Sequence, residues 1–217
     1  MSTILKKITR IIGKPDETRR TTDAAEGEVN IYKEWEQRGF TAPSPHLIKQ
    51  AVVLRNGIPG ATWVETGTYM GQTTELLSRH GSKVYSIEPE PTLYANAKQR
   101  FRSVSNVEIL NGTSEDIFPT LVPTLTGAVS FWLDGHYSGD GTHKGPLDTP
   151  VEREMACIAD NLRHMDKAVI MIDDIRLFNG QIHAYGNYPT LDDLVNWARA
   201  NGLAWHIEQD IFIAKKT

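Results

Sequence analysis

The sequence predicts an α/β protein built on a doubly wound, mostly parallel sheet of seven strands, preceded in the chain by N-terminal helices. Three observations predict this class. Five short apolar runs alternate with segments of helical character, which is typical of a parallel sheet. The first run leads into a turn with two glycines, Gly67 and Gly71. Four of the runs end in acidic residues, at the strand ends where open α/β sheets bind ligands.

The elements follow from apolar runs and helix signals. Strands are predicted at 62–64, 83–87, 107–110, 128–133 and 167–172, with a closing strand pair at 203–207 and 211–214. Helices are predicted at 73–79, 90–102, 149 to about 164, and 190–200. The last two begin at Thr149 and Thr190, each with an acidic residue three positions later, as in a capping box. Residues 138–148 form a polar loop with three glycines, of a length that is usually functional or disordered.

Length and composition are ordinary for one globular domain. The chain has 217 residues, of which 40% are hydrophobic and 23% charged, enough to bury a sizeable core. We expect a helical extension over residues 1–58 and the α/β domain over residues 59–217. Net charge is -4, without the basic excess of nucleic-acid binders, so no nucleic-acid partner is expected. The single Cys157 excludes an intramolecular disulfide, and no apolar run is long enough to span a bilayer, which favours a cytoplasmic protein.

Residues 1–20 differ from the rest of the chain, with six basic residues against two acidic ones. Apolar residues such as Ile4, Ile8 and Ile11 fall near helical spacing. A helix docked on the domain or on a partner subunit is the favoured interpretation, which leaves a homo-oligomer open. Contact with an anionic membrane surface is the less favoured alternative. Residues 15–30 are polar and are expected to connect flexibly to helices within residues 31–58.

The glycine turn reads Glu65-x-Gly67-x-x-x-Gly71. Glycines permit positive φ and let a ligand approach the backbone closely. The spacing differs from the G-x-G-x-x-G of dinucleotide-binding loops, which disfavours an NAD-dependent enzyme. By itself, the turn is equally compatible with an ordinary strand–helix connection.

Glu88 ends the second strand, 17 residues after Gly71. A carboxylate there can accept two hydrogen bonds from the hydroxyls of a ribose. Its position relative to Glu65 and Gly71 favours a ligand contact over a solvated strand end.

Acidic residues also follow the fourth and fifth strands, at Asp134 and at Asp173 and Asp174. Together with Glu65 and Glu88, they are predicted to converge on one crevice, because parallel strands end at the same edge of the sheet. Buried carboxylates without partners are costly, so this cluster needs a cation, a diol or water.

At this point the sequence resembles a known family. The motifs Val-Glu-Thr-Gly-Thr-x-x-Gly, Ile-Glu-Pro, Asn-Gly-Thr-Ser, Trp-Leu-Asp-Gly-His-Tyr-Ser and Ile-Asp-Asp occur in this order within about residues 60–215. They resemble class I S-adenosylmethionine (SAM)-dependent methyltransferases, which have a Rossmann-like seven-stranded sheet. Asp134-Gly135 and Asp173-Asp174 are locally similar to the macrocin-type, metal-dependent sugar O-methyltransferases. The loop after Asp134 departs from that group, being longer and richer in Gly, His and Lys.

The resemblance implies a role for each matching residue. SAM would be cradled by Glu65, Gly67, Thr68 and Gly71, with Asp134 nearby; Glu88 would bind the ribose, and Thr113 and Ser114 would lie at the adenine. Asp134, Asp173 and Asp174 would hold Mg²⁺, a hard ion suited to carboxylates.

The implied reaction is methyl transfer from SAM to a hydroxyl of a small molecule or a glycan, assisted by the metal. Besides Asp134, His136 is the first candidate for a catalytic base and His143 the second, because imidazole titrates near neutral pH. Three alternatives stay open: a SAM-binding relative without activity, an NAD-dependent enzyme, and a metal-dependent hydrolase.

Overall fold

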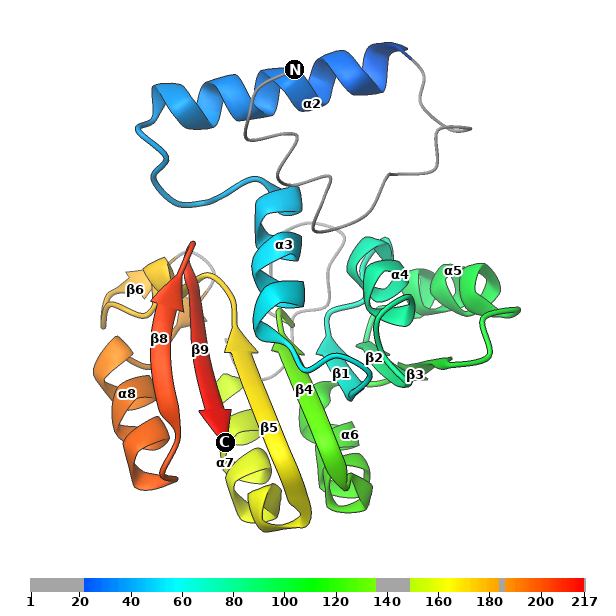
Figure 1. Ribbon diagram of the computed structural model, residues 1–217, viewed down its shortest axis with the longest axis vertical. Coiled ribbons are helices and arrows are strands. Elements are labelled where there is room, and N and C mark those ends of the chain that lie inside the picture. Colours follow the sequence, from blue (N-terminus) through cyan, green and yellow to red (C-terminus); the bar gives the residue numbers. More distant parts are fainter. Residues whose placement is uncertain (1–21, 136–148, 184–185, 217) are drawn as a thin grey trace.

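A single seven-stranded sheet organises the protein. The computed structural model describes residues 22–135, 149–183 and 186–216. The strand order is β3-β2-β1-β4-β5-β9-β8, in which β1 to β5 are parallel and β9 is antiparallel to β5 and β8 (Figure 1). The strands are β1 (Thr62–Thr66), β2 (Lys83–Glu88), β3 (Val107–Asn111), β4 (Gly127–Leu133), β5 (Met165–Ile172), β8 (Ala204–Glu208) and β9 (Ile211–Lys216). The predicted fold class is confirmed.

Helices cover both faces of the sheet. The α-helices are α2 (Thr22–Gln37), α3 (His46–Asn56), α4 (Gln72–Ser78), α5 (Pro91–Phe101), α6 (Ser114–Leu121), α7 (Val151–Asn161) and α8 (Leu191–Ala200). Short 3₁₀ turns lie at Val122–Thr124, Leu162–His164 and Ile175–Leu177, and β6 (Ile182–His183) pairs with β7 (Gly186–Asn187). No described helix combines the length and apolar character needed to cross a bilayer.

The central strands β4 and β5 are mainly apolar because both faces of the sheet are buried. Consecutive residues of β4, Phe131 and Trp132, enter different cores on opposite sides of the sheet. The core on the Phe131 side includes side chains from α6, α7 and α8. The core on the Trp132 side includes Val52 and Val53 of α3 and Leu77 of α4. This continuous burial is what parallel strands of a doubly wound sheet require.

The helix α3 lies beyond the carboxyl ends of β4 and β5 (Figure 1), and side chains near its start line a pocket together with acidic residues at those strand ends. Its later residues Val52 and Val53 are almost fully buried against Trp63 and Val84. Apolar packing at one end therefore fixes the helix, and its first turn projects over the strand ends. The expected polar connection over residues 15–30 is partly wrong, because α2 already begins at Thr22.

The two capping boxes predicted from the sequence have different outcomes. At α8, the side chain of Thr190 accepts from the Asp193 backbone and Asp193 accepts from the Thr190 backbone, as predicted. At α7, the helix begins at Val151 with Pro150 as its N-cap residue, so Thr149 lies one position too early. Thr149 instead accepts a long 3.4 Å hydrogen bond from the Val151 backbone.

Candidate functional site

The glycine turn after β1 is held tightly against the end of β4. Gly67 has φ +85°, and a Cβ atom there would lie 2.6 Å from the carbonyl oxygen of Asp134. The Asp134 backbone N–H in turn donates to the Thr66 carbonyl at 3.2 Å. Gly71 has φ +74° and ends the turn, where a Cβ would lie 2.8 Å from the Phe101 ring. Glycine is needed at both positions because a side chain would collide with an adjacent element.

Glu88 closes the other side of this turn. Its Oε2 accepts a hydrogen bond from the Tyr69 backbone N–H at 2.8 Å, and its Oε1 accepts from the Glu90 backbone at 3.0 Å. The residue is only 4% exposed. The structure therefore brings Glu88 directly against the glycine turn.

Glu65 lies behind the turn, inside a cluster of hydroxyl groups. Its Oε2 accepts from Thr74 at 2.5 Å and from Ser86 at 2.6 Å. The Ser86 hydroxyl is also 2.6 Å from that of Thr68. Burial raises the pKa of Glu65 to about 7, although the hydroxyl donors oppose the shift. Glu65 is thus linked to Thr68, another residue of the predicted SAM cradle, through Ser86.

Thr113 and Ser114 begin α6 at the end of β3. Thr113 is the N-cap residue and accepts from the Asp116 backbone at 3.3 Å. Ser114 is buried and its hydroxyl, like that of Thr66, hydrogen-bonds to Glu154 of α7. Burial raises the pKa of Glu154 to about 7, and its Oε1 has no hydrogen-bond partner among the described residues. Glu154 was not predicted as a site residue.

We expect Glu154→Gln to change how stability depends on pH. The folded protein holds the Glu154 proton more tightly than the unfolded chain, whose pKa is near the ordinary 4.5. The resulting stabilisation is fully present below pH 4.5 and is lost as pH rises to about 7. The loss is on the order of 3 kcal/mol. Urea unfolding of the wild type and the variant at several pH values measures it.

The matched control for this experiment is Glu152→Gln, because Glu152 is exposed on the same helix. The wild type and Glu152→Gln should lose stability in parallel between pH 4.5 and 7, and Glu154→Gln should lose less. If the free energy of unfolding fell equally with pH in all three proteins, the conclusion that Glu154 is buried in its neutral form would be contradicted.

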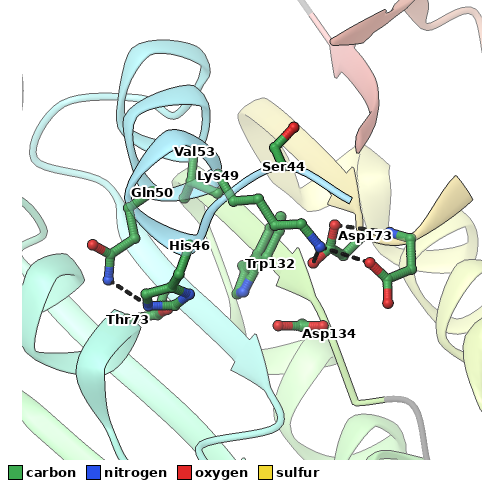
Figure 2. A pocket seen from close by; sticks show the side chains of 10 residues that line it. Ser44, His46, Lys49, Gln50, Val53, Thr73, Trp132, Asp134 and Asp173 are labelled. Carbon is green, nitrogen blue, oxygen red and sulfur yellow. Dashed lines mark hydrogen bonds and ion pairs between the residues drawn. The ribbon is translucent and has the colours of Figure 1, made fainter. Parts of the chain in front are cut away.

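A pocket lies between the first turn of α3 and the ends of β4 and β5. Its volume is about 200 Å³. Figure 2 shows Lys49 of α3 reaching the acidic side chains at the strand ends, while His46 and Gln50 of the same helix lie near Thr73. Its lining consists of Ser44, His46, Lys49, Gln50, Val53, Thr73, Trp132, Asp134, Asp173 and Asp174. The structure therefore brings the three predicted metal ligands, Asp134, Asp173 and Asp174, to one cavity.

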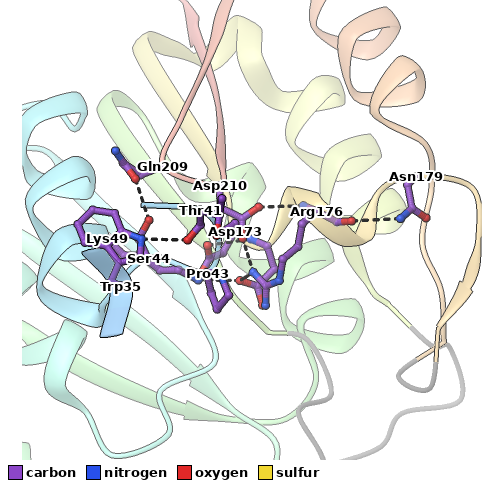
Figure 3. A network of polar contacts seen from close by, with 12 residues as sticks. Trp35, Thr41, Pro43, Ser44, Lys49, Asp173, Arg176, Asn179, Gln209 and Asp210 are labelled. Carbon is purple, nitrogen blue, oxygen red and sulfur yellow. Dashed lines mark hydrogen bonds and ion pairs between the residues drawn. The ribbon is translucent and has the colours of Figure 1, made fainter. Parts of the chain in front are cut away.

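Lys49 is paired with two of these carboxylates. Its Nζ lies 2.7 Å from Oδ2 of Asp173 and 2.6 Å from Oδ1 of Asp174. Burial opposes the charge of Lys49, but the two carboxylates outweigh it and raise its pKa. Burial also opposes ionisation of Asp174, yet Lys49 and Arg176 hold the pKa of this carboxyl below its ordinary value. Arg176 extends the network to Asp210, in the turn between β8 and β9 (Figure 3).

Asp134 has a different environment. Burial, followed by repulsion from Asp173, raises its pKa well above the ordinary value, and Lys49 opposes this only in part. Burial and Asp174 likewise raise the pKa of Asp173 to about 6 in spite of Lys49. The three carboxyl groups are therefore not equivalent, although they line one cavity.

This arrangement does not fit the predicted Mg²⁺ site. Among the described residues, no three His, Cys, Asp or Glu side chains lie in an arrangement that could hold one metal ion. Two of the three expected ligands are already paired with the Lys49 ammonium. We therefore assign no metal-dependent step to this protein.

The predicted bases His136 and His143 lie outside the described residues. The described part of the pocket contains a different imidazole, that of His46, which the sequence analysis did not name as a candidate base. Its Nε2 is 2.9 Å from the side-chain nitrogen of Gln50, and burial, reinforced by Lys49, lowers its pKa. The spacing of His46, Lys49 and Gln50, three and four residues apart on a helix, was a signal that could have placed them on one face.

Comparisons with known proteins agree with the fold. No family model matches the chain. The O-methyltransferase TomG from Streptomyces achromogenes, involved in tomaymycin synthesis and solved with SAM, has a TM-score of 0.54 and 14% identity, covering 99% of this chain and 95% of that chain. The 23S rRNA methyltransferase ErmE has a TM-score of 0.50 and 13% identity, covering 81% of this chain and 68% of that chain. These likenesses support the Rossmann-like methyltransferase fold.

One curated sequence relative is a probable ribosomal RNA small subunit methyltransferase A from Methanosarcina acetivorans, 30% identical over 87 residues. The match covers 38% of this chain and 32% of the relative, so this chain spans about a third of that protein's length. The expectation of no nucleic-acid partner is wrong, because this relative and ErmE are both named as rRNA methyltransferases. Net charge sums the whole chain and does not exclude a local RNA-binding surface.

Proposed function

We propose that this protein is a SAM-dependent methyltransferase. The observation that carries the proposal is the glycine turn, which contacts Glu88 on one side and the end of β4 on the other. This places a close-packed backbone turn and an acidic side chain at the edge of the sheet where α/β proteins bind ligands. The fold shared with TomG, solved with SAM, supports the same assignment.

SAM would lie along the ends of β1 and β2. In this proposal, the backbone of Gly67, Thr68 and Gly71 surrounds the methionine part, and Glu88 binds the ribose hydroxyls. Thr113 and Ser114 lie at the start of α6, beside β3, where the adenine would be expected. Glu65 would position Thr68 indirectly, because Ser86 hydrogen-bonds to both residues. Glu65 itself would not contact SAM.

The proposed acceptor carries a hydroxyl group and is a small molecule or one unit of a glycan. The pocket under α3 supports this choice because it is polar and has a volume of about 200 Å³. It adjoins the turn through Asp134, whose carbonyl oxygen packs against Gly67 and which also lines the pocket. Donor and acceptor would therefore meet at the end of β4, which satisfies the proximity that methyl transfer needs.

RNA is the second candidate acceptor. The observation that favours it is the 30% identity, over 87 residues, to a probable rRNA methyltransferase. An RNA substrate would have to place a single nucleotide in or beside the pocket, since a duplex does not fit a cavity of about 200 Å³.

Calorimetric titration of SAM into the purified protein tests the proposed function. We expect micromolar binding by the wild type and a loss of about tenfold or more in Glu88→Ala, since charge-assisted hydrogen bonds to a ligand contribute about 1.5–3 kcal/mol. The matched control is Glu108→Ala, which removes an exposed carboxylate of the neighbouring strand that pairs with Lys83.

Absence of SAM binding by the folded wild type would overturn the proposal. NAD would then be titrated in its place, followed by tests for metal-dependent hydrolysis. Binding without transfer to a hydroxyl panel or to RNA would favour a non-catalytic SAM-binding protein.

A further inference from the structure

The first turn of α3 presents polar side chains where a packed helix normally presents apolar ones. His46, Lys49 and Gln50 are three and four residues apart and line the same pocket. One turn further on, Val53 is buried in the core. A helix face directed at a sheet is usually an apolar stripe. The change from apolar to polar along this face suits a ligand site, whereas a purely structural helix would continue the apolar packing.

The Lys49 ammonium is held in that site by two carboxylates. Its side chain is only 14% exposed, and it lies 2.7 Å from Asp173 and 2.6 Å from Asp174. An ammonium group has three N–H donors. Asp173 and Asp174 are its acceptors among the described side chains, which leaves the third donor for a ligand in the cavity.

A divalent ion would compete for the same oxygen atoms. Mg²⁺ binds carboxylate oxygens at about 2.0–2.1 Å, so an ion shared by Asp173 and Asp174 would lie beside the Lys49 ammonium. Like charges at such a distance repel strongly in a partly buried site. Arg176 adds a second cation, with its Nη1 2.6 Å from Asp174. The carboxylates already have their counter-charges in this chain.

We propose that Lys49 takes the place of a metal ion in the acceptor site: its ammonium, fixed by Asp173 and Asp174, donates a hydrogen bond to the oxygen of a hydroxyl acceptor. The inference rests on the proposed methyltransferase function and narrows it to oxygen acceptors that react without a divalent cation.

The reaction is balanced without a metal. The acceptor O–H bond breaks and its proton passes to a nitrogen of the His46 imidazole, which lines the same pocket as Lys49. The Gln50 amide can turn its oxygen toward Nε2–H, which leaves the Nδ1 lone pair of His46 to take the proton. The oxygen electron pair forms the new bond to the methyl carbon, and the C–S electron pair returns to sulfur, so that the sulfonium becomes a thioether. Lys49 stabilises the negative charge that develops on the acceptor oxygen.

The pocket volume limits the part of the acceptor that enters. A cavity needs roughly 10–15 Å³ of such volume to hold one water molecule, so about 200 Å³ leaves room for a small ligand group. A single hydroxylated ring fits this space. Trp132 and Val53 give the pocket an apolar wall, and the α3 side chains and carboxylates provide polar contacts.

Metal binding tests the role of Lys49 without any knowledge of the acceptor. Mn²⁺, which can be followed by its electron paramagnetic resonance signal, is titrated into the wild-type chain, Lys49→Met, Lys49→Arg and the exposed-site control Lys167→Met. We expect stoichiometric Mn²⁺ binding by Lys49→Met alone, because removing the ammonium frees the carboxylates. If Lys49→Met is too weakly folded for titration, thermal unfolding with and without Mn²⁺ replaces the titration, and a higher midpoint with Mn²⁺ is expected.

Stoichiometric Mn²⁺ binding by the wild type or by Lys49→Arg, abolished by Asp174→Asn, would overturn the proposal. The proposal would also be overturned if Lys49→Met neither bound Mn²⁺ nor was stabilised by it. These outcomes are independent of SAM, so they are distinguishable from a failure of the proposed function, which would appear as absent SAM binding by the wild type.

Methyl transfer provides the second test. Tritiated SAM is incubated with methyl glycosides and catechol as hydroxyl probes, with and without EDTA. We expect EDTA to leave the wild-type rate unchanged, and Lys49→Met to lose about 100-fold in rate with SAM affinity retained. A wild-type rate that requires Mg²⁺, or a Lys49→Met rate equal to that of Lys167→Met, would contradict the proposed role.

Discussion

Gly67→Ala should abolish SAM binding and destabilise the protein. A Cβ atom at this position would lie 2.6 Å from the Asp134 carbonyl oxygen, with φ at +85°. The left-handed conformation alone costs about 1–2 kcal/mol for a residue with a Cβ. The collision adds to this, because the atom in the way is backbone and cannot rotate aside. Relief would require the glycine turn and the end of β4 to separate, which opens the proposed donor site.

Gly60→Ala is the matched control because Gly60 lies at the other end of β1 with φ +71° and has nothing within 4 Å of its Cβ position. We expect it to lose about 1–2 kcal/mol and keep SAM binding. Gly67→Ala should lose about 3 kcal/mol or more, as measured by urea unfolding, and bind no SAM in calorimetry. Indistinguishable results for the two variants would show that the turn does not depend on its contact with β4.

Asp173→Ala should also destabilise the protein. This carboxylate accepts from Lys49 at 2.7 Å and from the Asp174 backbone N–H at 2.8 Å, and it is 2% exposed. Removing one partner of a buried ion pair typically costs about 3–5 kcal/mol, since the remaining charge loses its compensation. Asp174 still pairs with Lys49, and burial and repulsion from Asp174 offset part of the stabilisation that Asp173 provides. We therefore expect a smaller loss of about 2 kcal/mol, or roughly 6 °C in melting temperature.

The control for this prediction is Asp166→Ala, an exposed carboxylate at the opposite end of the same strand. It should change the melting temperature by little. Adding Mg²⁺ or EDTA should leave the melting temperature of the wild type unchanged, because Lys49 already compensates the carboxylates. A wild type stabilised by several degrees by Mg²⁺ would instead favour the metal site predicted from the sequence.

Local sequence signals predicted the sheet well and the helix starts unevenly. The apolar runs of β4 and β5 identify buried parallel strands because both faces of these strands are covered, so nearly every residue must be apolar. Thr190 and Asp193 predicted the start of α8 because a capping box is complete within four residues. The same pattern at Thr149 failed, since Pro150 serves as the N-cap residue of α7. The helix α6 was not predicted at all; it is short and contains Pro119, both of which weaken a helical signal.

For the site, the sequence by itself determined which strand ends carry acidic residues, and parallel topology implies that they meet at one edge. It also determined where glycine interrupts the first connection. Only the tertiary structure decided the partners of these groups. Lys49 pairs with Asp173 across 124 positions of sequence, and Glu65 meets Ser86 through the register of β1 and β2. Charge compensation depends on distance in space, whereas sequence patterns report only neighbours along the chain. For this reason the sequence predicted a metal site at these carboxylates, whereas in the folded protein Lys49 provides the positive charge beside Asp173 and Asp174.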